Sequence, residues 1–145
     1  MMNRFLLWMV LFVAAFEAVA TDAVEFDYMM NCQGCHLPNG AGFPAHNVPA
    51  VAGNLGNFLG VDGGREFLVQ VPGSAQSDLD DARLAAVLNW MLVSFSAEQL
   101  PADWQHYSAA EVHDLRKTPL IEVSPLRAAL MDLIEVKQQT GGAGR

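Results

Sequence analysis

Cys32-Gln33-Gly34-Cys35-His36 contains the only two cysteines of the chain and decides how the rest of the sequence is interpreted. Four arrangements use two cysteines at this spacing: a short-range disulfide, a redox-active dithiol, half of a metal site, or covalent attachment of a c-type haem. Zinc would need a further ligand, but no third cysteine exists and the other histidines are scattered. A thioredoxin-like dithiol needs strands alternating with helices, whereas residues 24–31 have a helical pattern. A plain structural disulfide remains open.

Covalent haem attachment accounts for every residue of this motif. Two thiols three residues apart can form thioethers with the two vinyl groups on adjacent sides of a porphyrin. The histidine beside the second thiol then lies under the iron, and imidazole nitrogen is a good iron ligand. The sequence therefore predicts one haem c per chain, with Cys32 and Cys35 as the covalent haem-binding residues and His36 as the proximal axial ligand.

The first twenty residues differ in composition from the rest of the chain. Arg4 precedes an apolar run over residues 5–16, and the small residues of Ala18-Val19-Ala20 follow, which is typical of a secretory signal peptide cleaved after Ala20. A retained membrane anchor is the alternative, but the apolar run falls short of the ~20 residues of a spanning helix. We therefore expect a signal peptide over 1–20, export to the periplasm, and no stable membrane span after cleavage.

Length and charge exclude several classes of protein. A chain of 145 residues is the size of a single domain. Its formal net charge of −8 argues against nucleic-acid binding, which needs a basic surface to meet phosphates. Two cysteines are also too few for a disulfide framework. A small acidic globular protein remains, and we find no pattern of catalytic nucleophile and base in it.

Short helices separated by loops are predicted around the motif. The first runs from Asp22 to the cysteines, and the glycine-rich stretch 37–64 is predicted to be loop. A short helix over 64–71 should end at Pro72. Ser77-Asp78-Leu79-Asp80 has the form of a capping box and should open a helix. The apolar stripe of that helix comprises Leu84, Val87, Leu88, Met91, Leu92 and Phe95.

The last fifty residues predict two further helices. Ser108 to Glu111 forms a capping box for a helix to about Lys117, and Ser124 with Pro125 makes an N-cap and first-position pair for a helix to about Gln138. Its apolar face would comprise Leu126, Leu130, Leu133 and Ile134. The predicted organisation is a signal peptide over 1–20, a haem domain over 21–98, a helical extension over 99–140, and a disordered tail over 141–145.

Residues 22–95 resemble the class I cytochromes c, especially the small bacterial periplasmic ones. The resemblance rests on the order of several features: Tyr28 one turn before the haem motif, Gly40-Ala41-Gly42-Phe43-Pro44 after it, Pro49-Ala50-Val51-Ala52-Gly53-Asn54, and the helix around Trp90. It implies an all-α, cytochrome c-like fold of short helices around one covalent haem, here with a C-terminal helical extension. It also implies electron transfer rather than catalysis.

The chain departs from this family in the loop before its last core helix. Class I cytochromes usually place a methionine there as the sixth iron ligand, whereas Val71 to Leu79 reads VPGSAQSDL. The distal ligand is therefore unknown, and the candidates are Met91, Met131 and His46. For Met91 a packed core methionine is the alternative, and for His46 a solvated loop residue. An empty or water-filled sixth position also stays open.

These features favour a periplasmic monohaem cytochrome that carries single electrons between a dehydrogenase or reductase and a terminal acceptor. Its partners would be redox proteins such as a periplasmic dehydrogenase or a terminal oxidase or reductase. The acidic charge predicts a basic docking patch on the partner. The alternative is a haem-based binder of small ligands, or a peroxidase-like enzyme, with an open distal site.

Overall fold

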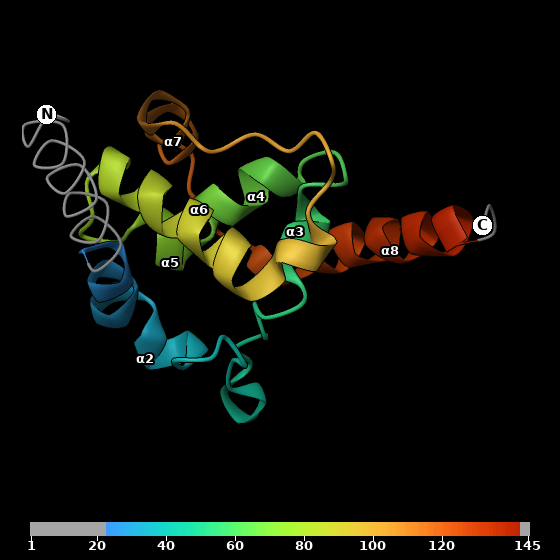
Figure 1. The fold of residues 1–145 in the computed structure, drawn as a ribbon, viewed down its shortest axis with the longest axis horizontal. Helices are drawn as coiled ribbons and strands as arrows, with labels where there is room; N and C mark the ends of the chain where they lie inside the picture. Colours follow the sequence, from blue (N-terminus) through green and yellow to red (C-terminus); the bar gives the residue numbers. More distant parts are fainter. Residues whose placement is uncertain (1–22, 143–145) are drawn as a thin grey trace, which may run out of the picture.

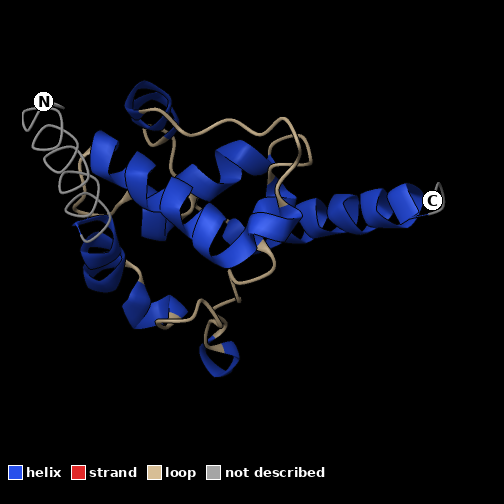
Figure 2. Ribbon diagram, viewed as in Figure 1, coloured by secondary structure: helices blue, strands red, loops and turns tan. Residues whose placement is uncertain are grey.

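The computed structural model describes residues 23–142. The predicted signal peptide over 1–20 and the last residues of the predicted tail, 143–145, lie outside the described residues. Within 23–142 the chain is helical and contains no strand, which confirms the all-α fold class (Figure 2). The helices are residues 23–31, α2 (Gln33–His36), η1 (Pro44–His46), α3 (Leu55–Phe58), α4 (Gly64–Gln70), α5 (Pro72–Ala75), α6 (Asp81–Ser96), η2 (Ala97–Gln99), α7 (Ala109–Leu115) and α8 (Val123–Gly142).

α6 is the central helix, and the other elements surround it (Figure 1). The predicted apolar stripe is confirmed: five of its members are at most 5% exposed, and Phe95 is half-buried. The predicted cap is wrong by one turn, because the N-cap is Asp80, whose carboxylate accepts a hydrogen bond from the Arg83 amide at 2.8 Å. Ser77 lies in a turn instead, where its carbonyl accepts a hydrogen bond from Arg116.

The helix over 23–31 packs against α6 through its aromatic side chain. Tyr28 is 1% exposed, and its ring centroid lies 5.1 Å from that of Trp90 and 5.2 Å from that of Phe95. Next to Tyr28 in the chain, the buried carboxylate of Asp27 pairs with the guanidinium of Arg83. The segment that enters the cysteine motif is therefore fixed to the central helix by apolar and ionic contacts.

The stretch between the motif and α6 follows the prediction only in part. The predicted loop over 37–64 contains two single turns, η1 and α3, besides its irregular backbone. α4 forms where GREFLVQ predicts it, and Phe67, Leu68 and Val69 are buried. Pro72 follows the end of α4, as expected, but it also begins the extra turn α5, since proline at the first helical position loses no hydrogen bond.

The C-terminal residues share the core of the preceding helices. Tyr107 and Val112 are buried around α7, and Leu130 and Ile134 are buried on α8. At the start of α7, Ser108 accepts a hydrogen bond from the Glu111 amide at 3.2 Å, as predicted. The Glu111 carboxylate does not complete the capping box, however, because it pairs with Arg65 of α4.

α8 differs from its prediction at both ends and on its apolar face. It begins at Val123, so Ser124 lies inside the helix and is not its N-cap. Pro125 fits within the first turn, because the backbone N–H groups there have no helical partner. It continues to Gly142 and projects away from the other helices, so the first two residues of the predicted disordered tail are helical (Figure 1). Leu126 and Leu133 are exposed, because only one side of α8 meets the core.

Arg116, just after α7, ties the C-terminal residues to the segment before α6. Its guanidinium donates hydrogen bonds to the backbone carbonyls of Ala75, Ser77 and Leu79 at 2.8 to 3.2 Å. It also pairs with the Asp81 carboxylate at 3.0 Å. Because the Arg116 side chain is only 18% exposed, these groups depend on it for their hydrogen bonds.

We predict that Arg116→Gln lowers the free energy of unfolding by about 2–4 kcal/mol, because it leaves several backbone carbonyls without a charged donor. The matched control is Lys117→Gln, which removes the exposed ion pair with Asp114 and should cost less than about 0.5 kcal/mol. Urea unfolding followed by circular dichroism measures both. Equal effects of the two substitutions would contradict the role of Arg116.

Candidate haem site

The structure brings the three predicted haem-binding residues together on one helical turn. Cys32 occupies the N-cap position of α2, and the amides of Cys35 and His36 donate hydrogen bonds to its carbonyl at 3.2 and 3.0 Å. The Cys32 amide in turn donates to the Tyr28 carbonyl at 2.8 Å, so this turn directly continues the preceding helix. Cys32 is half-buried, Cys35 is exposed, and the two sulfurs form no disulfide.

The environment of Cys32 is unlike that of a redox-active dithiol. Burial, together with the negative charges of Asp27 and Cys35, raises the pKa of its thiol to about 11. A reactive thiol needs the opposite, a lowered pKa that yields thiolate at neutral pH. Within residues 23–142, no three side chains of the His, Cys, Asp or Glu type form a cluster that could hold a metal ion by themselves. The turn therefore favours neither dithiol chemistry nor a zinc site.

His36 has a buried nitrogen whose hydrogen-bonding capacity is unused. Its Nδ1 is one of two such side-chain atoms among the described residues, the other being Ser77 Oγ. Burial lowers the pKa of the imidazole below its usual value. The nearby Pro49 carbonyl offsets only part of this lowering, and its contact with the ring falls short of hydrogen-bond geometry. A backbone carbonyl close to the ring is the type of acceptor that orients a metal-binding imidazole. Two free thiols, this histidine and its carbonyl therefore fit a covalently bound haem.

The backbone of residues 37–53 returns the chain to His36. Tyr28 donates its hydroxyl hydrogen bond to the Leu37 carbonyl at 2.6 Å, and burial raises the pKa of Tyr28 to about 12. The Gly42 amide donates to the His36 carbonyl at 3.1 Å, and the Gly53 amide to the Phe95 carbonyl of α6 at 2.7 Å. These bonds hold the loop to the cysteine turn at one end and to the central helix at the other.

Gly42 allows the backbone at Pro49 to approach closely. Its φ is +70°, and a Cβ at this position would lie 2.5 Å from the carbonyl carbon and oxygen of Pro49. A side chain here would therefore push away the carbonyl that faces His36. Gly42 and Pro49 both belong to the motifs on which the family resemblance rests. Neither has a reactive side chain, so the sequence did not indicate that they are in contact.

We predict that Gly42→Ala lowers both stability and haem content more than Gly53→Ala does. Both glycines have positive φ, so each substitution should cost about 1–2 kcal/mol of backbone strain. Nothing lies within 4 Å of a Cβ at Gly53, whereas the overlap at Gly42 should add about 1–3 kcal/mol. The measurements are urea unfolding and covalently bound haem per chain. Equal stability and equal haem content of the two variants would show that the close approach of Pro49 to Gly42 is not required for the site.

The candidate distal ligands lie on three different elements. Met91 is 5% exposed and belongs to the apolar core on α6, and Met131 is half-buried on α8 and packs against that core. His46 is exposed in η1, with its ring centroid 4.4 Å from that of Phe43. The structure thus gathers the proximal residues on one turn but does not gather the distal candidates.

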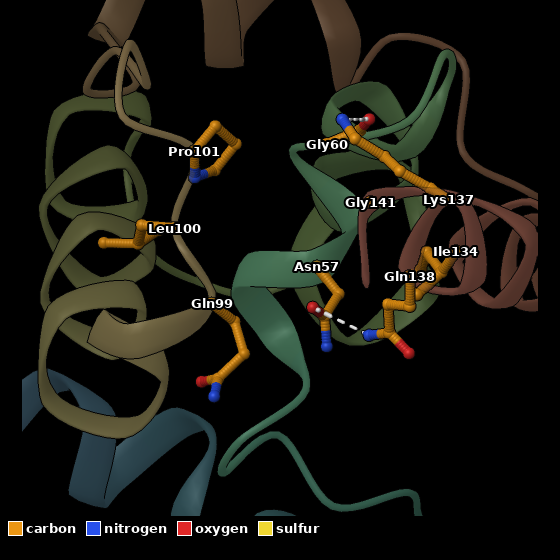
Figure 3. Close-up of a pocket in the computed structure, with 9 residues that line it drawn as sticks. All are labelled: Asn57, Gly60, Gln99, Leu100, Pro101, Ile134, Lys137, Gln138 and Gly141. Atoms are coloured by element: carbon orange, nitrogen blue, oxygen red, sulfur yellow. Dashed lines mark hydrogen bonds between the residues drawn. The ribbon is translucent and has the colours of Figure 1, made fainter. Parts of the chain in front are cut away.

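A separate pocket of about 530 Å³ lies between α3, the η2 region and α8 (Figure 3). None of its lining residues belongs to the cysteine turn. The polar groups of α8 in it are already engaged, because Lys137 donates to the Gly60 carbonyl and Gln138 donates to the Asn57 side chain (Figure 3). This pocket joins α8 to α3 and offers no free charged group to a ligand.

Comparison with known proteins agrees with the geometry of the turn. The chain is 31% identical over 107 aligned residues to cytochrome c-552 of Thermus thermophilus, covering 61% of this chain and 81% of that protein. A second cytochrome c-552 from the same species is also 31% identical over 107 residues, which cover 72% of it. The chain belongs to the c-type cytochromes. No family model matches it, and no solved structure does.

Membership in the c-type cytochromes implies a covalently attached haem and an electron-carrying role. Cys32, Cys35 and His36, the residues for which the sequence predicts this role, lie on one turn. Within residues 23–142, no helix is both long and apolar enough to cross a membrane.

Proposed function

We propose that this c-type cytochrome carries single electrons in the periplasm through one haem c. Cys32 and Cys35 would hold the porphyrin by thioethers, and His36 would be its proximal iron ligand. The observation that carries the proposal is the turn itself, in which two free thiols and an imidazole share one carbonyl-linked helical turn. Haem iron, when bound, supplies a one-electron couple between its ferric and ferrous states.

The side chains of this cytochrome would position the haem and limit its motion. Tyr28 and Asp27 hold the attachment helix against α6, so the thioether positions stay fixed relative to the core. The Pro49 carbonyl, close to the His36 ring, would accept a hydrogen bond from one ring nitrogen and leave the other for the iron. A rigid site of this kind suits electron transfer, because little has to rearrange when the iron changes charge.

Export and partner choice complete the proposal. The signal peptide expected over 1–20 would deliver the chain to the periplasm, where c-type haem is attached. The partners would be a dehydrogenase or reductase that donates electrons and a terminal acceptor such as an oxidase or reductase. The net charge of −8 favours partners with a basic docking patch and a transient interface.

Haem attachment is tested by expression with a cytochrome c maturation system. We expect one haem per chain that stays bound after denaturation and acid-acetone extraction. The double variant Cys32→Ala/Cys35→Ala should retain none, because both thioethers are lost. The control His106→Ala replaces an exposed histidine outside the turn and should retain the haem fully. Wild-type protein without extraction-resistant haem would disprove the assignment.

Electron transfer is tested with small oxidants of opposite charge. The ferrous protein should react with a cationic oxidant at a rate that falls as salt is added, because salt screens the attraction to the acidic surface. With an anionic oxidant of similar potential, the rate should rise with salt. Stopped-flow absorbance of the haem measures both. A holoprotein whose iron cannot be oxidised and reduced reversibly would not be an electron carrier.

A further inference from the structure

Among residues 23–142, no side chain is evident as the second axial ligand of the haem iron. The inference rests on the haem attachment proposed above, but not on electron transfer. The side chains that bind haem iron in proteins are histidine, methionine, cysteine, tyrosine and, as an amine, lysine. Outside the cysteine turn, residues 23–142 contain four methionines, three histidines, two tyrosines and two lysines.

None of the four described methionines lies in the segment between the cysteine turn and α6. Met29 and Met30 are 45% and 64% exposed on the helix that leads into Cys32, within one turn of the attachment point. A ligand opposite His36 must instead come from a segment beyond the edge of the porphyrin. Met91 and Met131 pack in or against the apolar core, where methionine serves as a gap-filling side chain.

The three remaining histidines have other partners. His46 lies in η1, in a short loop that the bridge between Phe43 and Val48 closes, and its ring makes a tilted contact with that of Phe43. His106 stacks on Trp104 with ring centroids 4.6 Å apart. The Nδ1 atom of His113 lies 2.9 Å from the Asp81 carboxylate, at the start of α6. All three are exposed to solvent.

The tyrosines and lysines are engaged as well. Tyr28 donates its hydroxyl hydrogen bond to the Leu37 carbonyl, and Tyr107 donates to the Arg65 carbonyl at 2.8 Å. Lys117 pairs with Asp114 and Lys137 donates to the Gly60 carbonyl. Among the described residues, both tyrosines and both lysines therefore have hydrogen-bond or ion-pair partners.

The segment before α6 is also held in place. Residues 75–79 contain no methionine, histidine, lysine or tyrosine. Arg116 binds three of their carbonyls, so this segment is fixed to the C-terminal residues and cannot move freely toward a haem. Because the segment contains none of these side chains, a rearrangement of its backbone would not bring an iron ligand to the haem.

We propose that this cytochrome leaves the sixth coordination position of its iron to a small neutral molecule from solution, of the diatomic class that includes carbon monoxide and nitric oxide. Binding forms one coordinate bond from the ligand to ferrous iron and displaces at most a bound water, without a change of oxidation state. Neutral ligands are favoured over anions such as cyanide, because the protein carries a net charge of −8.

The test is a carbon monoxide titration of the reduced holoprotein, followed by its absorption spectrum. We expect a high-spin ferrous spectrum that converts to a low-spin one with one carbon monoxide bound per haem. A low-spin, six-coordinate spectrum in both oxidation states, unaffected by carbon monoxide, would overturn the proposal. Extraction-resistant haem is measured on the same samples, so a failure of ligand binding is distinguished from a failure of haem attachment.

Single variants guard against a weakly held protein ligand. Met91→Leu, Met131→Leu and His46→Ala, with Met29→Leu and Met30→Leu as further variants, should each change the half-saturating carbon monoxide concentration by less than about twofold. A variant that binds carbon monoxide at least about tenfold more tightly than the wild type would identify its residue as the native sixth ligand and would overturn the proposal. Leucine preserves the volume of methionine, so these variants are expected to fold.

Discussion

The packing of the first described helix on α6 is the contact on which the site depends. Tyr28 meets Trp90 and Phe95 in tilted ring contacts, each worth about 0.5–1.5 kcal/mol beyond the area it buries. Asp27 is 5% exposed, and a carboxylate so buried needs the guanidinium of Arg83 as its partner. Because the cysteine turn directly continues this helix, any shift in its packing would displace both thiols and the imidazole together.

The sequence predicted those features that depend on residues close together in the chain. The turn with Cys32, Cys35 and His36 follows from a five-residue motif, and the buried face of α6 follows from helical spacing. The Ser108 cap is likewise a local pattern, and the structure contains it. Such patterns survive folding because the contacts that they need form within one or two turns of the chain.

Features that depend on distant residues could not be predicted. The cap of α6 moved to Asp80 because the carbonyl of Ser77 is bound by Arg116, about forty positions later. The approach of Pro49 to His36 depends on Gly42, because a side chain there would overlap the Pro49 carbonyl in the folded loop. The apolar pattern of α8 marked Leu126 and Leu133 as buried, but only one side of that helix meets the core. In each case tertiary contacts, not local preference, determined the outcome.

The C-terminal residues share one apolar core with the preceding helices. Val112 is fully buried, and Arg65 pairs with Glu111 while its guanidinium lies over the Tyr107 ring at 4.1 Å. These contacts, with the hydrogen bonds of Arg116, fix α4 and the segment before α6 from the outside. A short, immobilised segment cannot supply an iron ligand by rearrangement. The same C-terminal contacts that complete the core would therefore also limit which side chains could reach the iron of a haem held by the cysteine turn.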